Sequence, residues 1–478
     1  MRSRHAWARA LVVGLLTTIA LPIVTTPARA ATARWDPRVL SIAREVEALR
    51  GLKFERPVPV DFLPSAAFDR RLGKDRGDLS PADRAQLERS EAQLRAIGLL
   101  PPGVDLLSAQ NALLRTSVAA FYDPATKRAT VRGDKLTPVV EVTLAHELTH
   151  ALQDQHFDLL RLQRAAARNH ATSALTALAE GDAVRVQLLY ADKLSARDHA
   201  TYERARERDG RAERAALRAA GIPDSLVVML ESPYDLGPSM LQLVGAVDGR
   251  HAIDALFRSP PTSDSSYLTP TTLVDGSHAV DVTPPVLQPG ETAVGTSDVF
   301  GSFALYLMLA ARSDPVHALG VADGWAGDAE VTFTRGGTTC LRAAFAGRSA
   351  DATTAIEGAL EQWAAQAPAG SAQAAPTGDL AGLTACDPGV AGVTASDGSL
   401  AALAVATVRN LLIGTLADQR VGTEVAACTA NGVVADPAFH PVLDAVVADP
   451  SAEPNPKLLG PVQQSLLTNL TRCRVATK

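Results

Sequence analysis

The segment "AHELTHALQDQH", from Ala145 to His156, holds three histidines and one glutamate, residue types that bind and use metal ions. In a helix, residues four apart lie on one face, so His146 and His150 can each direct a ring nitrogen at one zinc ion, about 2.0–2.1 Å away. Glu147 lies beside that pair, where its carboxylate can take a proton from a zinc-activated water and pass it to a leaving amine. The pattern predicts a site for Zn²⁺ with Glu147 as general base.

A purely structural interpretation of the same residues is a pair of hydrogen-bonded core histidines without a metal. That interpretation leaves Glu147, which stands between Ala145 and Leu148, as a buried charge with no partner. A metal ion accounts for the two histidines and the glutamate together.

Glu180 is the expected third ligand. It lies in "ALTALAEGDAVRVQLL", an otherwise apolar helix in which a lone carboxylate is costly unless a metal or hydrogen bonds compensate. A second helix packed antiparallel to the first would complete a set of two His and one Glu and leave a fourth position for water. Asp182 could orient a histidine from outside that set, or be exposed at a helix turn. The other nearby acids lie in a densely charged, solvated helix: Glu203, Glu207 and Glu213.

His156 is the alternative third ligand. It stands ten positions after His146, the spacing of the H-E-x-x-H-x-x-G-x-x-H metzincin pattern, but Gln153 replaces the glycine of that pattern. The glycine lets the chain leave the helix, and without it His156 lies about 9 Å along the axis from His150. We expect Glu180 to be the ligand, with a metzincin-like site that uses His156 as the alternative.

The elements that must position these residues are mostly helices. Aromatic residues make up 4% of the chain while Ala and Leu abound, which favours helices over strands. "PVPVDFL" alternates as a short strand, and "AAFYDPATKRATVRG" predicts a hairpin with its turn at Asp123–Thr126. Ser80 and Pro81 predict a capped helix start. The expected fold class is α+β, mainly helical.

The N-terminus has the features of a secretory signal peptide. Arg2, Arg4 and Arg9 precede an apolar run, and Ala28-Arg29-Ala30 supplies a cleavage site, so residues 1–30 are expected to be removed on export. The alternative is a membrane anchor, but the run is shorter than the roughly 20 apolar residues that a spanning helix needs. We expect a secreted or extracytoplasmic protein with no stable membrane span after cleavage.

The mature chain is expected to have two parts, 31–345 with the metal site and 346–478 with a linker (367–382) and helices. Residues 1–30 carry four arginines and no acid, so the formal net charge moves from −6 to −6 − 4 = −10 on cleavage. A net acidic exported chain is a poor partner for nucleic acid or an anionic membrane.

Four cysteines stand in the last third of the chain, where an oxidising compartment would pair them in one of three connectivities. We predict pairing by proximity, Cys340 with Cys386 and Cys428 with Cys473. A zinc site of four thiolates is the alternative, but no C-x-x-C spacing supports it.

"HELTHA" followed about thirty residues later by "AEGDA" resembles the gluzincin metallopeptidases, and within them exported bacterial zinc peptidases. The motifs "ALRGLKF", "VPVDFL", "GLLP", "FYDPATKRATV", "LAHELTHALQDQHFDL" and "ALAEGDA" follow in order over roughly residues 40–345. The resemblance implies a gluzincin-like domain with a small edge-strand sheet, and a disulfide-tied helical region after it. It implies a cleft edged by the "ATV" strand (129–131), which would hold an extended peptide by main-chain hydrogen bonds.

One loop departs from the resemblance. After a double proline such proteins tend to carry Glu-Gln and His-Pro, where "SPPTSDSSYLTP" has Ser265-Ser266 and Thr269-Pro270. If that histidine supports the oxyanion in relatives, this chain lacks it. Tyr267 and His278 are candidate substitutes, and the oxyanion donor stays unassigned.

The sequence thus predicts an exported zinc-dependent peptidase that acts on a peptide or protein substrate, with His146, His150 and Glu180 as ligands. A non-catalytic zinc-binding or interaction protein is the alternative that the altered loop supports. Retention of Glu147 argues against it, because a structural metal site needs no general base. A serine hydrolase lacks support, since the chain has no G-x-S-x-G motif.

Overall fold

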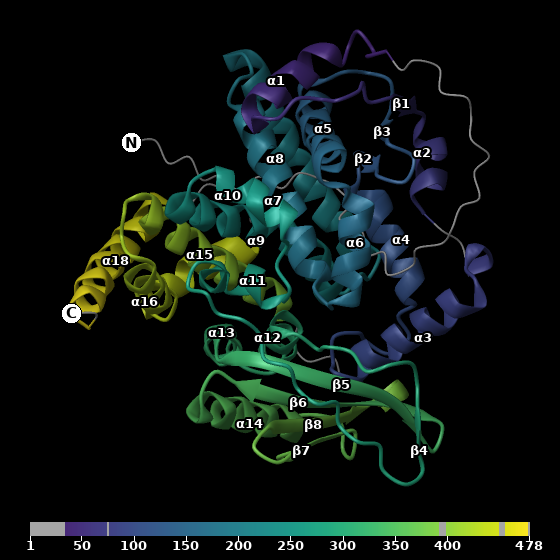
Figure 1. Cartoon of the computed structure of the whole chain (residues 1–478), viewed down its shortest axis with the longest axis vertical. Coiled ribbons are helices and arrows are strands. Elements are labelled where there is room, and N and C mark those ends of the chain that lie inside the picture. Colours follow the sequence, from purple (N-terminus) through teal and green to yellow (C-terminus); the bar gives the residue numbers. More distant parts are fainter. Residues whose placement is uncertain (1–33, 74–75, 392–397, 449–454, 477–478) are drawn as a thin grey trace.

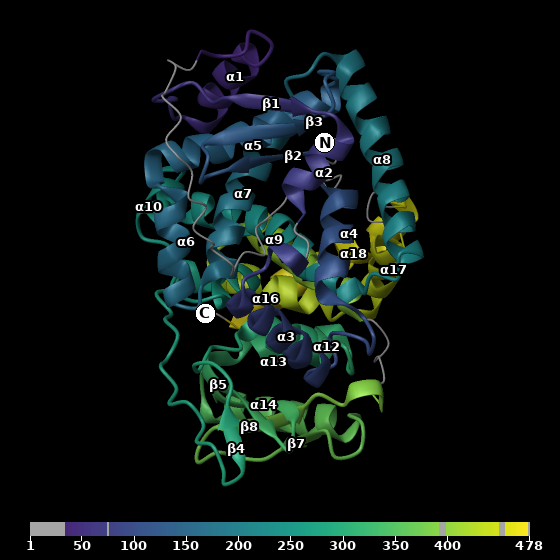
Figure 2. The ribbon, with the colours of Figure 1, turned by 90° about the vertical axis from the view of Figure 1, so that its right-hand side faces the viewer.

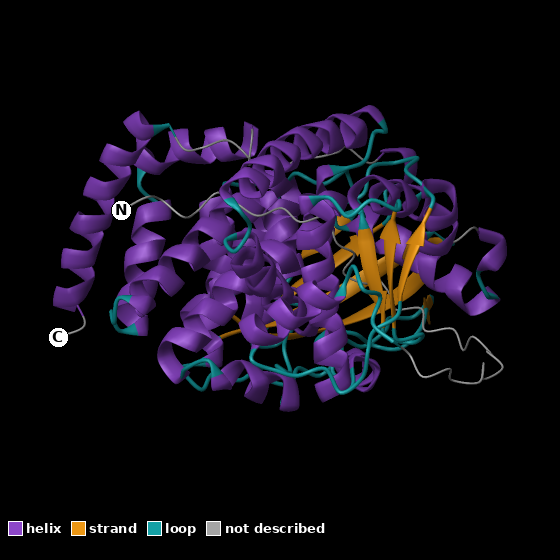
Figure 3. Ribbon diagram, turned by 90° about the horizontal axis from the view of Figure 1, so that it is seen from above, coloured by secondary structure: helices purple, strands orange, loops and turns teal. Residues whose placement is uncertain are grey.

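The structure, a computed structural model, describes residues 34–73, 76–391, 398–448 and 455–476. The signal peptide predicted over residues 1–30 lies outside them. Helices make up most of the described chain, and the strands form two small sheets (Figure 3). The predicted mainly helical α+β fold is therefore confirmed.

A three-stranded sheet contains β1 (Val60–Leu63), β2 (Ala120–Asp123) and β3 (Arg128–Arg132). The strand order is β1-β3-β2, with β1 parallel and β2 antiparallel to β3. The predicted hairpin and the "PVPVDFL" strand are both present. The expectation that the "ATV" strand forms the edge is wrong, because β1 pairs with the other side of β3 and makes it the central strand. The edges are β1 and β2.

The helices from α1 to α10 lie around this sheet and toward the centre of the molecule, except α3, which packs against the five-stranded sheet described below (Figure 1). Ser80 accepts a hydrogen bond from the Asp83 N–H at the start of α3, as the capping prediction requires. Their bounds are α1 (Leu40–Arg50), α2 (Ser65–Leu72), α3 (Pro81–Ala96), α4 (Leu106–Ser117), α5 (Pro138–Phe157), α6 (Leu159–Arg168), α7 (Thr172–Ala191), α8 (Ala196–Ala219), α9 (Asp224–Asp248) and α10 (His251–Arg258), with the 3₁₀ turn η1 (Arg76–Asp78).

A five-stranded antiparallel sheet lies at the opposite end of the molecule (Figures 1 and 2). Its order is β4-β5-β6-β8-β7, and α14 (Ala350–Ala365) packs against it. The bounds are β4 (Glu291–Ala293), β5 (Trp325–Arg335), β6 (Thr338–Gly347), β7 (Ala372–Ala374) and β8 (Ala381–Cys386).

This sheet crosses the boundary expected between residues 345 and 346. β6 runs through that point, and β8 pairs with β6 from the far side of it. Within the segment 367–382, expected as a linker or a mobile loop, Ala372–Ala374 form β7 and the last two residues begin β8, because the edge of β8 offers β7 main-chain hydrogen-bond partners.

The remaining described helices are α11 (Ser265–Leu268), η2 (Pro270–Leu273), α12 (Ser302–Ala310), α13 (Pro315–Asp323), η3 (Gly389–Ala391), α15 (Ser399–Asp418), α16 (Thr423–Val434), η4 (Pro437–Phe439), α17 (His440–Ala448) and α18 (Pro456–Ala476). Disulfides join Cys340 of β6 to Cys386 of β8, and Cys428 of α16 to Cys473 of α18. The predicted pairing is confirmed, and two disulfides fit an oxidising extracytoplasmic compartment.

Among the described helices, α15 is long and apolar enough to cross a membrane by length and composition. However, 67% of its most apolar stretch is buried inside the protein, and it packs along α9 and α16. Its apolar character is therefore that of a core helix.

Two hydrophobic cores meet along α7. Leu175 and Leu178, in its first half, belong to the large core shared with α9, α12, α15 and the five-stranded sheet. Val186 and Tyr190, in its second half, belong to the core shared with α1, α5 and the three-stranded sheet. Glu180 lies between the two cores.

Candidate metal centre

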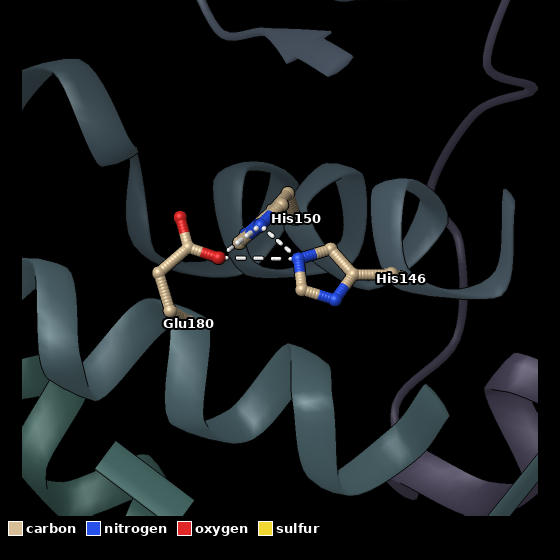
Figure 4. Close-up of side chains that lie close together, drawn as sticks. All are labelled: His146, His150 and Glu180. Atoms are coloured by element: carbon tan, nitrogen blue, oxygen red, sulfur yellow. Dashed lines mark hydrogen bonds and ion pairs between the residues drawn. The ribbon is translucent and has the colours of Figure 1, made fainter. Parts of the chain in front are cut away.

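α5 and α7 supply the two histidines and the glutamate (Figure 4). Thr137 caps the start of α5 and Pro138 occupies its first turn, so the helix begins directly after the hairpin. Its middle, from Val142 to Asp154, is buried without interruption. A helix buried on all sides needs no amphipathic stripe, and its few polar side chains must find partners inside the protein.

The donor atoms of the three side chains converge at one point. The Nε2 atoms of His146 and His150 lie 3.0 Å apart, and each lies 3.1 Å from Oε2 of Glu180. A tetrahedral ion with bonds of about 2.0–2.1 Å separates its ligand atoms by about 3.3–3.4 Å. The triangle is close to that size, so this buried group could bind a metal ion.

The electrostatics of the cluster also favour a positive charge at this point. Burial raises the pKa of Glu180, but the imidazoles of His150 and His146 lower it more, to about 2. Burial lowers the pKa of His150, but Glu180 raises it more, to about 9. The carboxylate thus stabilises a positive charge beside it, which a metal ion can supply in place of the imidazole proton.

Glutamines orient both imidazoles through their other ring nitrogen. Nδ1 of His146 lies 2.8 Å from Oε1 of Gln187, and Nδ1 of His150 lies 3.0 Å from Oε1 of Gln153. An amide oxygen only accepts, so each Nδ1 carries the proton and leaves Nε2 free to bind a metal.

Asp182 acts on His150 indirectly, through Gln153. Its Oδ2 accepts a hydrogen bond of 3.1 Å from the Gln153 amide, and it also pairs with Arg50 at 2.6 Å. The amide of Gln153 donates to the Ala179 carbonyl as well, at 2.9 Å. Of the two sequence interpretations, Asp182 is therefore the buried partner that fixes a histidine, through Gln153.

His156 lies away from the cluster. Because Gln153 stands where the metzincin pattern has glycine, α5 continues to Phe157 without a break. The exposed ring of His156 lies instead with its Nε2 2.8 Å from the Lys53 carbonyl oxygen. The structure therefore brings Glu180 to the histidine pair and keeps His156 outside it.

Glu147 lies beside the cluster with no partner of its own. Its side chain is fully buried, and neither carboxylate oxygen has a hydrogen bond within the described part of the chain. Burial raises its pKa, although the nearby histidines and, more weakly, the backbone N–H of Tyr122 lower it. Glu147, His150 and Glu180 share a cavity of about 80 Å³, well above the roughly 10–15 Å³ that one water needs.

Tyr122 of the edge strand β2 and Pro124 of the turn that follows it form one wall of this small cavity. The Tyr122 hydroxyl donates to Asp154 at 2.7 Å, which fixes the wall against α5. The Arg132 N–H donates to the Ala119 carbonyl, so by the alternation of antiparallel strands Ala120 and Tyr122 turn their main-chain groups away from β3. These groups face the free edge of the sheet.

Tyr234 of α9 is a site residue that the sequence interpretation missed. Its ring stacks on His146 with centroids 6.2 Å apart, and its buried hydroxyl has no hydrogen-bond partner among the described residues. Burial raises the pKa of Tyr234 well above its usual value, and the charges of Glu180 and Glu147 and the Glu180 carboxylate, as a weak hydrogen-bond acceptor, raise it further. The phenol therefore keeps its proton.

Two glycines let α9 come this close. A Cβ on Gly181 would lie 2.5 Å from the backbone of Gly237, and one on Gly237 would lie 2.2 Å from the Ala177 carbonyl oxygen. Close packing of α7 and α9 therefore requires glycine at position 181, because any side chain there would push α9 and Tyr234 away from the cluster.

The loop "SPPTSDSSYLTP", whose sequence departs from the gluzincin resemblance, lies away from the small cavity at Glu147. Ser265 and Ser266 are buried in α11 and bond to Ser263, and Thr269 donates to Asp323. Tyr267 is buried against Phe303, and His278 lines a separate surface pocket. Neither candidate oxyanion donor lines the small cavity at Glu147.

No protein-family model, curated protein or solved structure matches this chain. The case for a function therefore rests on the residues and the geometry of the site.

Proposed function

We propose that this protein is an exported zinc-dependent peptidase of gluzincin type, with His146, His150 and Glu180 as the ligands of Zn²⁺. One observation carries the proposal. Three donor atoms meet in a triangle of metal-site size, and a buried carboxylate, Glu147, lies beside them with no other partner among the described residues.

The donor set fits zinc better than the common alternatives. Two imidazoles and one carboxylate suit Zn²⁺, whereas Ca²⁺ and Mg²⁺ prefer sites made of oxygen ligands. Three protein ligands with an open fourth position are typical of catalytic zinc sites. When bound, the ion would polarise a substrate carbonyl and acidify a water molecule.

Glu147 is the group that moves the proton. Its carboxylate opens into the small cavity with His150 and Glu180, so an attacking water held there lies within reach of it. Burial raises the pKa of Glu147, which makes it a stronger base than an exposed glutamate. The same carboxyl then passes the proton to the leaving amine.

β2 is the proposed docking edge for the substrate. The main-chain groups of Ala120 and Tyr122 face outward, so an extended peptide can add to the sheet as a further strand beside the cavity. Side chains of such a strand alternate between the sheet faces, and every second one points toward α5 or away from it.

The test combines metal content with hydrolysis. The chain from Ala31 onward, Glu180→Ala and His156→Ala are purified, their zinc is measured, and each is incubated with denatured casein. We expect one zinc per unmodified chain, loss of zinc and hydrolysis in Glu180→Ala, and neither loss in His156→Ala.

Zinc binding without hydrolysis in the unmodified chain would favour the non-catalytic alternative. The placement of Ser265, Ser266 and Thr269 away from the cavity is the observation that favours it. No zinc at all would refute both functions.

A further inference from the structure

A second and larger cavity adjoins the candidate metal centre. Its volume is about 460 Å³, and it lies between α3, α4, α7, α9, α12 and β5. Most of its wall is apolar, with representative side chains from Leu94, Ile97, Leu230, Phe303 and Leu307. A cavity of this size falls in the range of small-molecule and side-chain binding sites, about 300–1,000 Å³.

One face of α7 connects the two cavities. Thr172 and Thr176 line both of them, and Glu180 follows at the next four-residue step on the same helix face. The helix rise places Thr172 about 12 Å along the axis from Glu180. An extended peptide covers that distance in about four residues. A substrate cut at the metal centre can therefore reach the larger cavity with a residue near that distance.

The wall of the larger cavity carries a carboxyl group with no cation beside it. Glu330 of β5 is 7% exposed, and one of its oxygens accepts a hydrogen bond of 3.1 Å from the Gln93 amide. Its other oxygen has no donor, and no lysine or arginine pairs with Glu330 within the described residues. Burial and the nearby Asp298 and Asp328 raise the pKa of Glu330 to about 8.

We propose that the larger cavity binds a lysine or arginine side chain of the peptide substrate, about four residues from the cleaved bond, with Glu330 pairing its charged end. This inference rests on the proposed peptidase function. The apolar wall covers the aliphatic stem of such a side chain, and the cation supplies the partner that Glu330 lacks.

Two other occupants fit the cavity less well. An apolar side chain would leave Glu330 buried without a cationic partner, at a free-energy cost that a leucine or glutamine at this position would avoid. An acidic side chain would add a like charge beside Glu330, Asp298 and Asp328.

Binding is tested without catalysis. The zinc-loaded chain from Ala31 with Glu147→Gln is titrated with two series of acetylated alanine heptapeptides by calorimetry. One series carries a single lysine at each successive position, and the other carries norleucine, which has the same four-carbon chain without the amine. We expect lysine to bind about tenfold more tightly than norleucine at one position.

Adding Glu330→Gln should abolish that lysine preference, because a neutral amide cannot pair with the ammonium group. The same change should not unfold the protein, since glutamine matches the protonated carboxyl in shape and charge. Glu361→Gln, an exposed glutamate on α14, is the matched control and should keep the preference.

Three results would each overturn the inference. Norleucine peptides could bind as tightly as lysine peptides at every position, the lysine preference could survive Glu330→Gln, or no peptide could bind. Casein hydrolysis by the unmodified chain judges the peptidase function separately, so the two failures are distinguishable.

Discussion

Glu180 and Glu330 are both buried carboxyl groups, 4% and 7% exposed, yet their surroundings give them opposite charge states. Two imidazoles beside Glu180 hold its pKa at about 2, whereas burial with two neighbouring acids raises the pKa of Glu330 to about 8. At neutral pH the first is a carboxylate in a cationic cluster. The second keeps its proton at the wall of an apolar cavity.

The difference shows that burial alone does not assign a role to an acidic residue. Glu180 has its partners inside the protein, the two histidines on α5, and together the three side chains could bind a metal at a fixed place. Glu330 has no cationic partner within the described chain, so this carboxyl is suited to a ligand that brings a positive charge to it and leaves again. Each prediction below tests one side of this contrast.

The largest effect is expected from Glu147→Gln. Hydrolysis of casein should fall by about 10²–10⁴-fold, the usual contribution of a general base, while the zinc content stays at one per chain. Metal analysis and initial rates on the same sample measure both. Glu141→Gln, also on α5, is the control and should keep its activity; full activity in Glu147→Gln would mean that another group is the base.

Glu330 should make the folded protein less stable as the pH rises, whereas an acid in a salt bridge makes a folded protein less stable as the pH falls. The folded state keeps the proton up to about pH 8, while the unfolded chain loses it near pH 4.5, so stability falls as pH rises between these values. Glu330→Gln removes that loss and should be more stable than the unmodified chain at pH 9, by at most about 5 kcal/mol.

Urea unfolding at pH 5 and pH 9 measures this difference. The two proteins should differ much less at pH 5, because that pH is close to the usual glutamate pKa of 4.5 and only a small part of the pH-dependent loss of stability has occurred there. A variant that is less stable at pH 9 would show that the folded protein stabilises the ionised Glu330 with a cationic partner.

Gln153→Ala should weaken zinc binding by about 10–100-fold, the usual effect of removing a group that orients a metal-binding histidine. The change frees the His150 ring and breaks its link to Asp182. Competition with a chromogenic chelator gives the affinity. Gln163→Ala is the control, since Gln163 lines the same cavity but makes no hydrogen bond to the cluster; equal losses in the two variants would assign no orienting role to Gln153.

Local features of the sequence predicted the part of the site that lies on α5 and α7. The four-residue spacing of His146 and His150 is a property of one helix, and Glu180 is conspicuous as a charge in an apolar helix. Gln187 follows Glu180 by seven residues, two helical turns, so its place on the same face could also have been inferred. Tyr234 comes from a third helix, and only the approach of α9 at Gly181 and Gly237 brings it near.

The errors in the fold have the same origin. The resemblance placed β3 at the edge of its sheet, whereas β1, which covers its other side, lies more than sixty residues earlier in the sequence. The segment 367–382 has the composition of a linker, and its strand forms only because β8 is there to pair with it. Pairing between distant segments leaves little trace in local composition.

The smallest effect is expected from Tyr234→Phe. A buried hydroxyl without a hydrogen bond destabilises the folded state, so removing it should make the metal-free protein more stable by about 1 kcal/mol. Urea unfolding after chelation measures the change. If Tyr234 serves the site, casein hydrolysis should fall in the same variant, because the phenol lies beside Glu180 and Glu147 and keeps its proton. A variant that gains stability and keeps full activity would place Tyr234 in packing alone, and one that loses stability would show that the hydroxyl has a partner in the folded protein.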